Sequence, residues 1–302
     1  MASFGRIVRS VKAFSREWNR VAGLSKSRPT LGLALGGGFA RGIAHIGVLK
    51  VLEEEGIPVD YVAGTSVGAI IGAGYCSGMS AAELADMAAT LRMSHFARLT
   101  LSRYGFYNND RMLRLFERML KQRRFEDLKI PLAVVATEFR TGEPTVFTEG
   151  QLADPIRASC AYPGMFLPVE IGGKSYIDGM LAYSVPTTPL RQMGADCVLG
   201  IYLSAHWSQA KPPRHVFEVI GQCFSIAQAK LADSWKKDAS LVIEPELAGF
   251  SYDCFERTPD LITVGEMAMK AVLPQVRAML GLSAPQRVGV SPVVNPQTSP
   301  AA

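Results

Sequence analysis

Residues 64–68, GTSVG, place a serine between small residues at the end of an apolar, strand-like run. The G-x-S-x-G pattern permits a sharp turn from strand to helix that lifts the serine hydroxyl clear of the backbone. Gly64 and Gly68 leave room for this turn, so Ser66 is the candidate nucleophile. A serine hydroxyl attacks a carbonyl only when a base takes its proton. The chemistry therefore requires a second residue.

A glycine-rich turn, Gly36-Gly37-Gly38, follows the apolar run at 31–35. Glycines remove side chains from the backbone, so the N–H groups there can converge on an anion at the start of a helix. We expect this turn to supply an oxyanion hole. Nucleotide binding is a weaker alternative, because Arg41 occupies the third glycine position of G-x-G-x-x-G and no G-K-[ST] occurs.

The proton acceptor is more easily found among the carboxylates than among the four histidines of this chain. None of the histidines has the context of a triad base: they are His45 in a helical pattern, His95 in an irregular segment, and His206 and His215 beside a proline-containing loop. A buried carboxylate with a raised pKa can accept the proton instead. Asp178, which ends a short strand and precedes Gly179, is the best-placed candidate.

Hydrophobic periodicity predicts alternating strands and helices that would position these residues. The expected strands cover 31–35, 59–63, 131–137, 145–147, 175–177, 197–203 and 240–244, and the expected helices cover 40–55, 80–93, 110–121, 154–158, 186–193, 214–237 and 260–280. Residues 94–108 are expected to be irregular. Short connections favour parallel strands with helices on both faces. The predicted fold class is therefore a three-layer α/β/α fold with a central, mostly parallel sheet.

Two segments leave open alternatives. The uncharged stretch 61–82 is long enough to cross a membrane, but its recurring Gly, Ser, Thr and Tyr favour a buried strand and helix. The helix at 110–121 carries a broad apolar stripe, which usually packs in the core and can also line an acyl pocket.

The first 28 residues carry a net charge of +6 and the whole chain carries +5, so the rest of the chain is close to neutral. They contain seven Lys or Arg and one Glu, whereas the other residues contain 25 basic and 26 acidic side chains. Residues 4–22 form a basic amphipathic pattern, which predicts a helix on an anionic membrane surface or one docked on the protein body. An organelle presequence is a third interpretation. The nearly neutral body gives no electrostatic case for nucleic acid.

The remaining composition bounds the domains and the cellular setting. The five cysteines include no C-x-x-C pair and no zinc-like spacing, which favours reduced thiols in the cytoplasm. We expect a catalytic domain at 29–282 and a disordered tail at 283–302, where Ser, Pro, Gln and Thr replace apolar residues. The expected location is cytoplasmic, with peripheral contact at the inner membrane face as an extension.

Four motifs occur in a fixed order: GGGFARG at 36–42, GTSVG at 64–68, SCAYPGMFLP at 159–168, and Asp178-Gly179. In order and spacing they resemble the patatin-like phospholipase family, over roughly residues 30–205. The likeness is strongest to the bacterial branch related to the catalytic domain of neuropathy target esterase. One position differs, since the family usually has Gly or Ala after Asp-Gly and this chain has Met180.

This resemblance implies a lipid acyl hydrolase in which Ser66 attacks an ester carbonyl and Asp178 takes its proton, without a cofactor or a metal. It also implies an oxyanion hole from the backbone of 36–38, with Arg41 bracing that loop or meeting a headgroup phosphate. The supporting residues would be Gly42, Gly64, Gly68 and Gly179. The implied substrate is a phospholipid or lysophospholipid. Two alternatives remain: a lipid-binding or regulatory scaffold with little turnover, and a thioesterase or neutral lipase that uses the same dyad.

Overall fold

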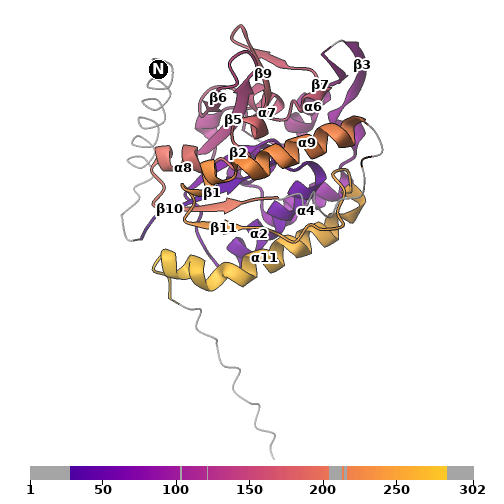
Figure 1. Cartoon of the computed structure of the whole chain (residues 1–302). Coiled ribbons are helices and arrows are strands. Elements are labelled where there is room, and N and C mark those ends of the chain that lie inside the picture. Colours follow the sequence, from indigo (N-terminus) through magenta and orange to yellow (C-terminus); the bar gives the residue numbers. More distant parts are fainter. Residues whose placement is uncertain (1–27, 103, 121, 204–212, 214–215, 284–302) are drawn as a thin grey trace, which may run out of the picture.

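A mixed sheet forms the centre of the protein (Figure 1). The computed structural model describes residues 28–102, 104–120, 122–203, 213 and 216–283. The sheet strands in this part are β1 (Leu31–Leu35), β2 (Tyr61–Thr65), β5 (Leu132–Glu138), β6 (Pro144–Phe147), β8 (Val169–Ile171), β9 (Lys174–Asp178), β10 (Cys197–Ile201) and β11 (Leu241–Ile243). Their order is β11-β10-β1-β2-β5-β9-β8, and β6 also pairs with β5. The predicted amphipathic segment 4–22 and nearly all of the predicted tail lie outside the described residues.

The middle of the sheet is parallel, as the sequence predicts. Strands β11, β10, β1, β2 and β5 run in one direction, whereas β6, β8 and β9 are antiparallel to their neighbours. β1, β2, β5 and β10 are buried along their whole length. Strands covered on both faces require nearly continuous apolar runs, and these sequences provide them.

Helices cover both faces of the sheet. One face packs against α2 (Ala44–Glu54), α3 (Val67–Cys76), α4 (Ala81–Thr90) and α11 (Thr258–Met279). The other face packs against α8 (Thr187–Met193) and α10 (Asp233–Lys236), whose Trp235 is almost completely buried. This arrangement confirms the three-layer α/β/α prediction.

Two sequence-based predictions of local structure are wrong. Residues 94–108, expected to be irregular, contain α5 (Met93–Phe96), β3 (Arg98–Ser102) and β4 (Gly105–Asn108). β4 pairs with the distant β7 (Gly164–Phe166), so the segment gains its order from a partner that local sequence does not indicate. The helix expected at 214–237 is divided between α9 (Val216–Leu231) and α10. Trp235 of α10 is buried and packs against Tyr202, with 5.2 Å between the ring centroids.

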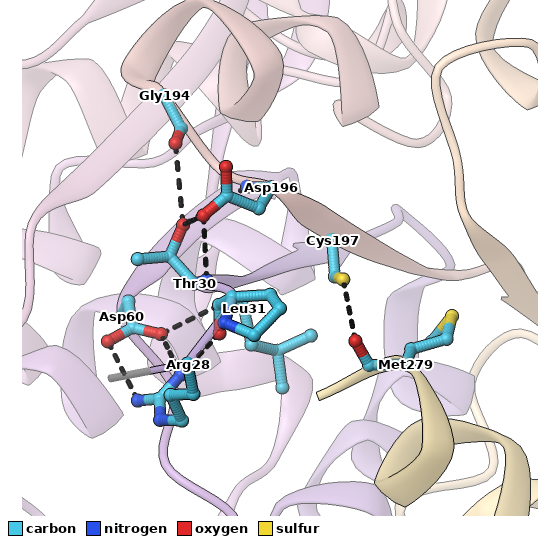
Figure 2. A network of polar contacts seen from close by, with 9 residues as sticks. Arg28, Thr30, Leu31, Asp60, Gly194, Asp196, Cys197 and Met279 are labelled. Atoms are coloured by element: carbon cyan, nitrogen blue, oxygen red, sulfur yellow. Dashed lines mark hydrogen bonds and ion pairs between the residues drawn. The ribbon is translucent and has the colours of Figure 1, made fainter. Parts of the chain in front are cut away.

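Polar contacts fix the amino-terminal end of β1 between its two neighbours (Figure 2). The Leu31 N–H donates to Asp60, just before β2, over 2.7 Å, and the Arg28 guanidinium binds both oxygens of the same carboxylate at 2.8 and 3.0 Å. The Thr30 N–H donates to Asp196, just before β10, over 2.9 Å. These contacts set the register at this edge and leave the opposite, carboxyl edge for a site.

The uncharged stretch 61–82 forms β2 and α3, which lie largely inside the core. Across the residues that the structure describes, none of the helices combines the length and the apolar character needed to span a membrane. Helix α6 (Arg111–Met119), which carries the predicted apolar stripe, packs that stripe against the core, together with α7 (Ala153–Ser159).

Candidate active site

Ser66 lies in a strained turn between β2 and α3. Its φ of 55° and ψ of −125° are unusual for a residue with a side chain, and such strain accumulates at functional sites. The turn is tight because β2 ends at Thr65 and α3 begins at Val67. A Cβ on Gly68 would overlap the carbonyl of Leu35, and one on Gly64 would lie 2.5 Å from Ala69 Cα. The two glycines of the motif are therefore required by contact with backbone.

Two strands deliver the serine and the aspartate to the same point. β2 runs parallel to β5 and ends with Thr65 opposite Val135, while β9 runs antiparallel to β5 and ends with Asp178 opposite Ala136. β6 occupies the other side of β5 at these positions. The carboxyl ends of β2 and β9 consequently meet head-on along one side of β5. Gly179 permits this junction, since a Cβ there would overlap the carbonyl of Val135.

The Ser66 hydroxyl donates a hydrogen bond of 2.8 Å to Asp178 Oδ2. The other carboxylate oxygen, Oδ1, accepts a 2.9 Å bond from the Met180 N–H, and Thr137 Oγ1 donates to the Asp178 carbonyl over 2.9 Å. These bonds hold the carboxylate with one oxygen facing the serine. The candidate nucleophile and the candidate base are thus within direct hydrogen-bond reach, without an intervening histidine.

Burial raises the pKa of Asp178 to about 7, although the hydrogen bonds from Met180 and Ser66 oppose this increase. The carboxyl is 1% exposed, so its charged form loses nearly all contact with water. A carboxylate with a pKa near neutral pH is a much stronger proton acceptor than a solvated aspartate. The environment of Asp178 therefore suits a general base.

Ser159 holds the backbone of the candidate nucleophile, Ser66, a contact that the sequence does not indicate. Its hydroxyl accepts a 2.8 Å bond from the Ser66 N–H and donates a 2.6 Å bond to the Val135 carbonyl. The residue ends α7 and is fully buried. Its place in the SCAYPGMFLP motif was the available signal, but the contact depends on how α7 packs over β5.

Two of the three N–H groups of the predicted oxyanion hole already donate hydrogen bonds within the protein. The Gly36 N–H donates to the Ile201 carbonyl over 3.1 Å, and the Gly37 N–H donates to the Ser184 carbonyl over 3.2 Å. Gly38 is the remaining member, and its N–H donates to no acceptor among the described residues. The Val67 N–H, in the first turn of α3 and next to the nucleophile, is a second candidate that the sequence reasoning missed.

His45 and Met180 support the glycine loop from two sides. His45 Nε2 lies 2.8 Å from the Gly36 carbonyl, and burial lowers the pKa of His45 to about 4, so the ring is neutral and donates this bond. The Met180 side chain lies where a Cβ on Gly37 would be, and therefore packs against the loop. The larger residue after Asp-Gly thus fills space over a glycine. His45 acts in packing and in the loop contact, as its helical context indicates.

Arg41 is 5% exposed, yet no carboxylate among the described residues pairs with it. Its guanidinium lies over the Tyr252 ring at 3.8 Å from the centroid, a cation–π contact. Its Nε is buried without a hydrogen-bond partner in the part of the chain described. Beside it, Gly42 brings the loop against α3, because a Cβ there would overlap the side chain of Val67.

An apolar pocket opens beside Ser66. It comprises about 730 Å³ of space, counting its open mouth, and none of its lining residues has a charged side chain. The lining consists of Phe39, Ile43, Ile46, Ser66, Val67, Ile70, Ile71, Met87, Ala88, Leu91, Phe96, Met112, Cys160, Phe166 and Phe255. Met112 comes from the apolar stripe of α6, whose other large side chains lie in the core. Core packing and pocket lining, the two interpretations of that stripe, therefore both apply.

Curated relatives match somewhat more than half of this chain. The chain is 35% identical to an NTE family protein of Mycobacterium tuberculosis over 191 residues, which cover 62% of this chain and 52% of that protein. It is 34% identical to human patatin-like phospholipase domain-containing protein 6 over 203 residues, which cover 63% of this chain and 15% of that protein. The chain thus spans about half the length of the mycobacterial relative.

The fold has a solved counterpart. VipD from Legionella pneumophila aligns with a TM-score of 0.50 at 14% sequence identity, over 83% of this chain and 67% of that one. The family model described as patatin-like phospholipase matches residues 33–191, which include both the serine turn and Asp178. By this match the chain belongs to the patatin-like phospholipase family.

Proposed function

We propose that this protein is a serine lipid acyl hydrolase of the phospholipase or lysophospholipase type. The observation that carries the proposal is the 2.8 Å hydrogen bond from Ser66, which lines an uncharged pocket, to the buried Asp178. The pocket supplies the site for a hydrocarbon chain, and the pair supplies a nucleophile with its base. Family membership supports the same class of reaction.

The first half of the reaction forms an acyl-enzyme. Ser66 Oγ attacks the ester carbonyl while its proton passes to Asp178 Oδ2, with which it is already hydrogen-bonded. The carbonyl oxygen becomes negatively charged and is stabilised by the Gly38 N–H group and by the Val67 N–H group, which lies at the positive end of α3. The leaving alcohol then takes the proton from Asp178 as the carbon–oxygen bond breaks.

The second half returns the enzyme to its starting state. Water attacks the acyl-enzyme, Asp178 accepts a proton from it, and the fatty acid leaves as Ser66 recovers its hydrogen. The same carboxyl serves as base and then as acid in each half of the reaction, which requires a pKa close to the working pH. Its pKa of about 7 meets this requirement.

Two features bear on the substrate class. The pocket is lined mostly by aliphatic and aromatic residues and suits an acyl chain. Arg41, three residues after Gly38, is buried and carries a positive charge without a carboxylate partner among the described residues. A phosphate-containing headgroup would pair with that charge. One relative, from Mycosarcoma maydis, carries the name lysophospholipase and is 32% identical over 200 residues, 10% of its length. A lysophospholipid is therefore the first substrate to test.

The test compares wild type, Ser66→Ala and Asp178→Asn on a short-chain chromogenic ester, a lysophospholipid and a monoacylglycerol. We expect both variants to remain folded and to lose at least about a hundredfold in kcat. Preference for lysophospholipid over monoacylglycerol would support the phosphate contact. Activity that survives Ser66→Ala would refute the mechanism. A folded wild type that is inert on a broad lipid and thioester panel would favour the scaffold alternative.

Membrane contact through residues 4–22 stays a prediction, as do a cytoplasmic location and the domain limits 29–282. The basic amphipathic pattern motivates the membrane prediction. Deleting residues 1–28 should weaken binding to anionic vesicles while sparing hydrolysis of a soluble ester. Unchanged vesicle binding would contradict it.

A further inference from the structure

Tyr252 contacts residues 36–41, the proposed oxyanion loop, at its last three positions, although Tyr252 lies well beyond the family match at 33–191. Its carbonyl accepts a 2.9 Å hydrogen bond from the Ala40 N–H. Its ring lies beneath the Arg41 guanidinium at 3.8 Å and meets the Phe39 ring edge-on, with 6.5 Å between centroids. One residue thus contacts three consecutive residues of the turn that follows Gly38.

That turn needs support from outside. Phe39 has a φ of 54°, in the left-handed region that a bulky side chain rarely adopts. Such strain persists only where the surroundings hold the backbone in place. Phe39 follows Gly38 directly, so its backbone conformation helps to set the direction of the Gly38 N–H. Holding Phe39 and Arg41 therefore holds the proposed oxyanion donor.

Tyr252 is itself anchored at its far end. Its hydroxyl lies 2.5 Å from Ser225 Oγ on α9, and Ser225 Oγ lies 2.9 Å from the Gly221 carbonyl. The same segment places Phe255 in the wall of the acyl pocket, stacked on Phe96 with 6.0 Å between centroids. The chain after residue 191 therefore reaches both the oxyanion loop and the pocket.

We infer that Tyr252 is a positioning residue that holds the oxyanion loop in its reactive geometry, and that the carboxyl-terminal part of the chain completes the active site in this way. The inference rests on the proposed function. Tyr252 touches no reacting atom and acts through the turn 39–41. Because the oxyanion exists only in the transition state, a loosened loop lowers kcat and leaves KM for a neutral ester nearly unchanged.

The experiment measures kcat and KM on a neutral short-chain ester, which removes any contribution of Arg41 to headgroup binding. Tyr252→Leu deletes the ring contacts and keeps an apolar side chain at this half-buried position. Tyr252→Phe removes only the hydroxyl contact, and Ser225→Ala removes that contact together with the bond from Ser225 Oγ to the Gly221 carbonyl. Phe250→Leu is the matched control, because the Phe250 ring lies under the exposed Arg257, at 4.0 Å, instead of the loop. Active-site titration with a fluorophosphonate and thermal unfolding report the folded, reactive fraction of each variant.

We expect Tyr252→Leu to lower kcat per titrated site by about tenfold to a hundredfold. Tyr252→Phe should restore kcat to within about threefold of wild type, since it restores the ring contacts, and Ser225→Ala and Phe250→Leu should match that level. A wild type that hydrolyses esters together with an equally active Tyr252→Leu would overturn this inference alone. An equal loss in Phe250→Leu would also overturn it. A wild type inert on every ester would overturn the proposed function and this inference with it.

Discussion

Replacing Asp178 with asparagine should abolish catalysis and at the same time stabilise the fold at alkaline pH. Burial raises the pKa of this carboxyl from 3.8 to about 7, so the folded protein resists ionising it. At 1.36 kcal/mol per pH unit, the gap corresponds to about 4 kcal/mol of cost for the charged form. Asparagine has the same shape and stays neutral. Its amide can keep both hydrogen bonds, from the Met180 N–H to its oxygen and from its NH₂ to Ser66 Oγ.

The pH dependence has a definite sign. Below pH 3.8 the carboxyl is protonated in both folded and unfolded chains, so wild type and Asp178→Asn should be equally stable. Between about pH 4 and 7 the unfolded chain releases its proton and the folded chain keeps it, so wild type loses stability as pH rises. Above about pH 7 both states are ionised, and the advantage of the variant should level off at an upper value of about 4 kcal/mol.

Urea unfolding at pH 5, 7 and 9 measures this advantage. Asp86→Asn, which removes one negative charge from the exposed face of α4, is the matched control and should change stability by less than about 0.5 kcal/mol at each pH. The kcat of wild type should rise with pH through about 7, as the base becomes ionised. A variant no more stable than wild type at pH 9, or an advantage that does not grow with pH, would refute the argument for a destabilised buried carboxylate.

Two further substitutions test the pocket and the support of the nucleophile. Ala88→Phe, in the pocket wall formed by α4, should lower kcat/KM for long acyl chains by about tenfold or more and spare a short ester. Ala89→Phe, on the exposed face of the same helix, should change neither value. Equal losses on long and short chains would place the acyl chain elsewhere. Ser159→Ala leaves the Ser66 N–H without its acceptor and should lower kcat together with stability, by about 1–3 kcal/mol in urea unfolding. Ser77 is another buried serine that donates to a nearby carbonyl, and Ser77→Ala should affect only stability. An unchanged kcat in Ser159→Ala would exclude a role in positioning Ser66.

Local sequence predicts the elements of this protein well where their order is intrinsic. The strand at Leu31–Leu35 has the predicted bounds, and most helices agree with their predicted ranges within a few residues. Continuous apolar runs and helical periodicity are patterns of neighbouring residues, so they can be recognised from the sequence alone. The sequence does not indicate β3 and β4, because β4 pairs with β7, a strand that follows only after β5 and β6 in the chain.

In the candidate site, too, local motifs are recognisable from the sequence, whereas contacts with distant segments are not. Ser66 and Asp178 were recognisable from the motifs around them, and their hydrogen bond is what the Ser-Asp hypothesis requires. The occupied N–H groups of Gly36 and Gly37 were not predictable, because their acceptors belong to segments more than a hundred residues away. A glycine-rich sequence shows that backbone is accessible to a ligand, but not which of its N–H groups are already engaged.

The geometry of the proposed dyad follows from the way β2 and β9 pair with successive residues along the same side of β5. β5 is longer than β2, so its last residues extend beyond Thr65 and remain open to another partner on that side. β9 takes this place in the opposite direction, and its last residue meets the first residue after β2. In a fully parallel sheet the carboxyl ends of β2 and β9 would lie side by side. They would then be separated by about 4.8 Å for each step from one strand to the next. The antiparallel partner instead brings an aspartate to the serine from the opposite direction, which places Asp178 directly against Ser66 and in the interior of the sheet, where burial raises its pKa.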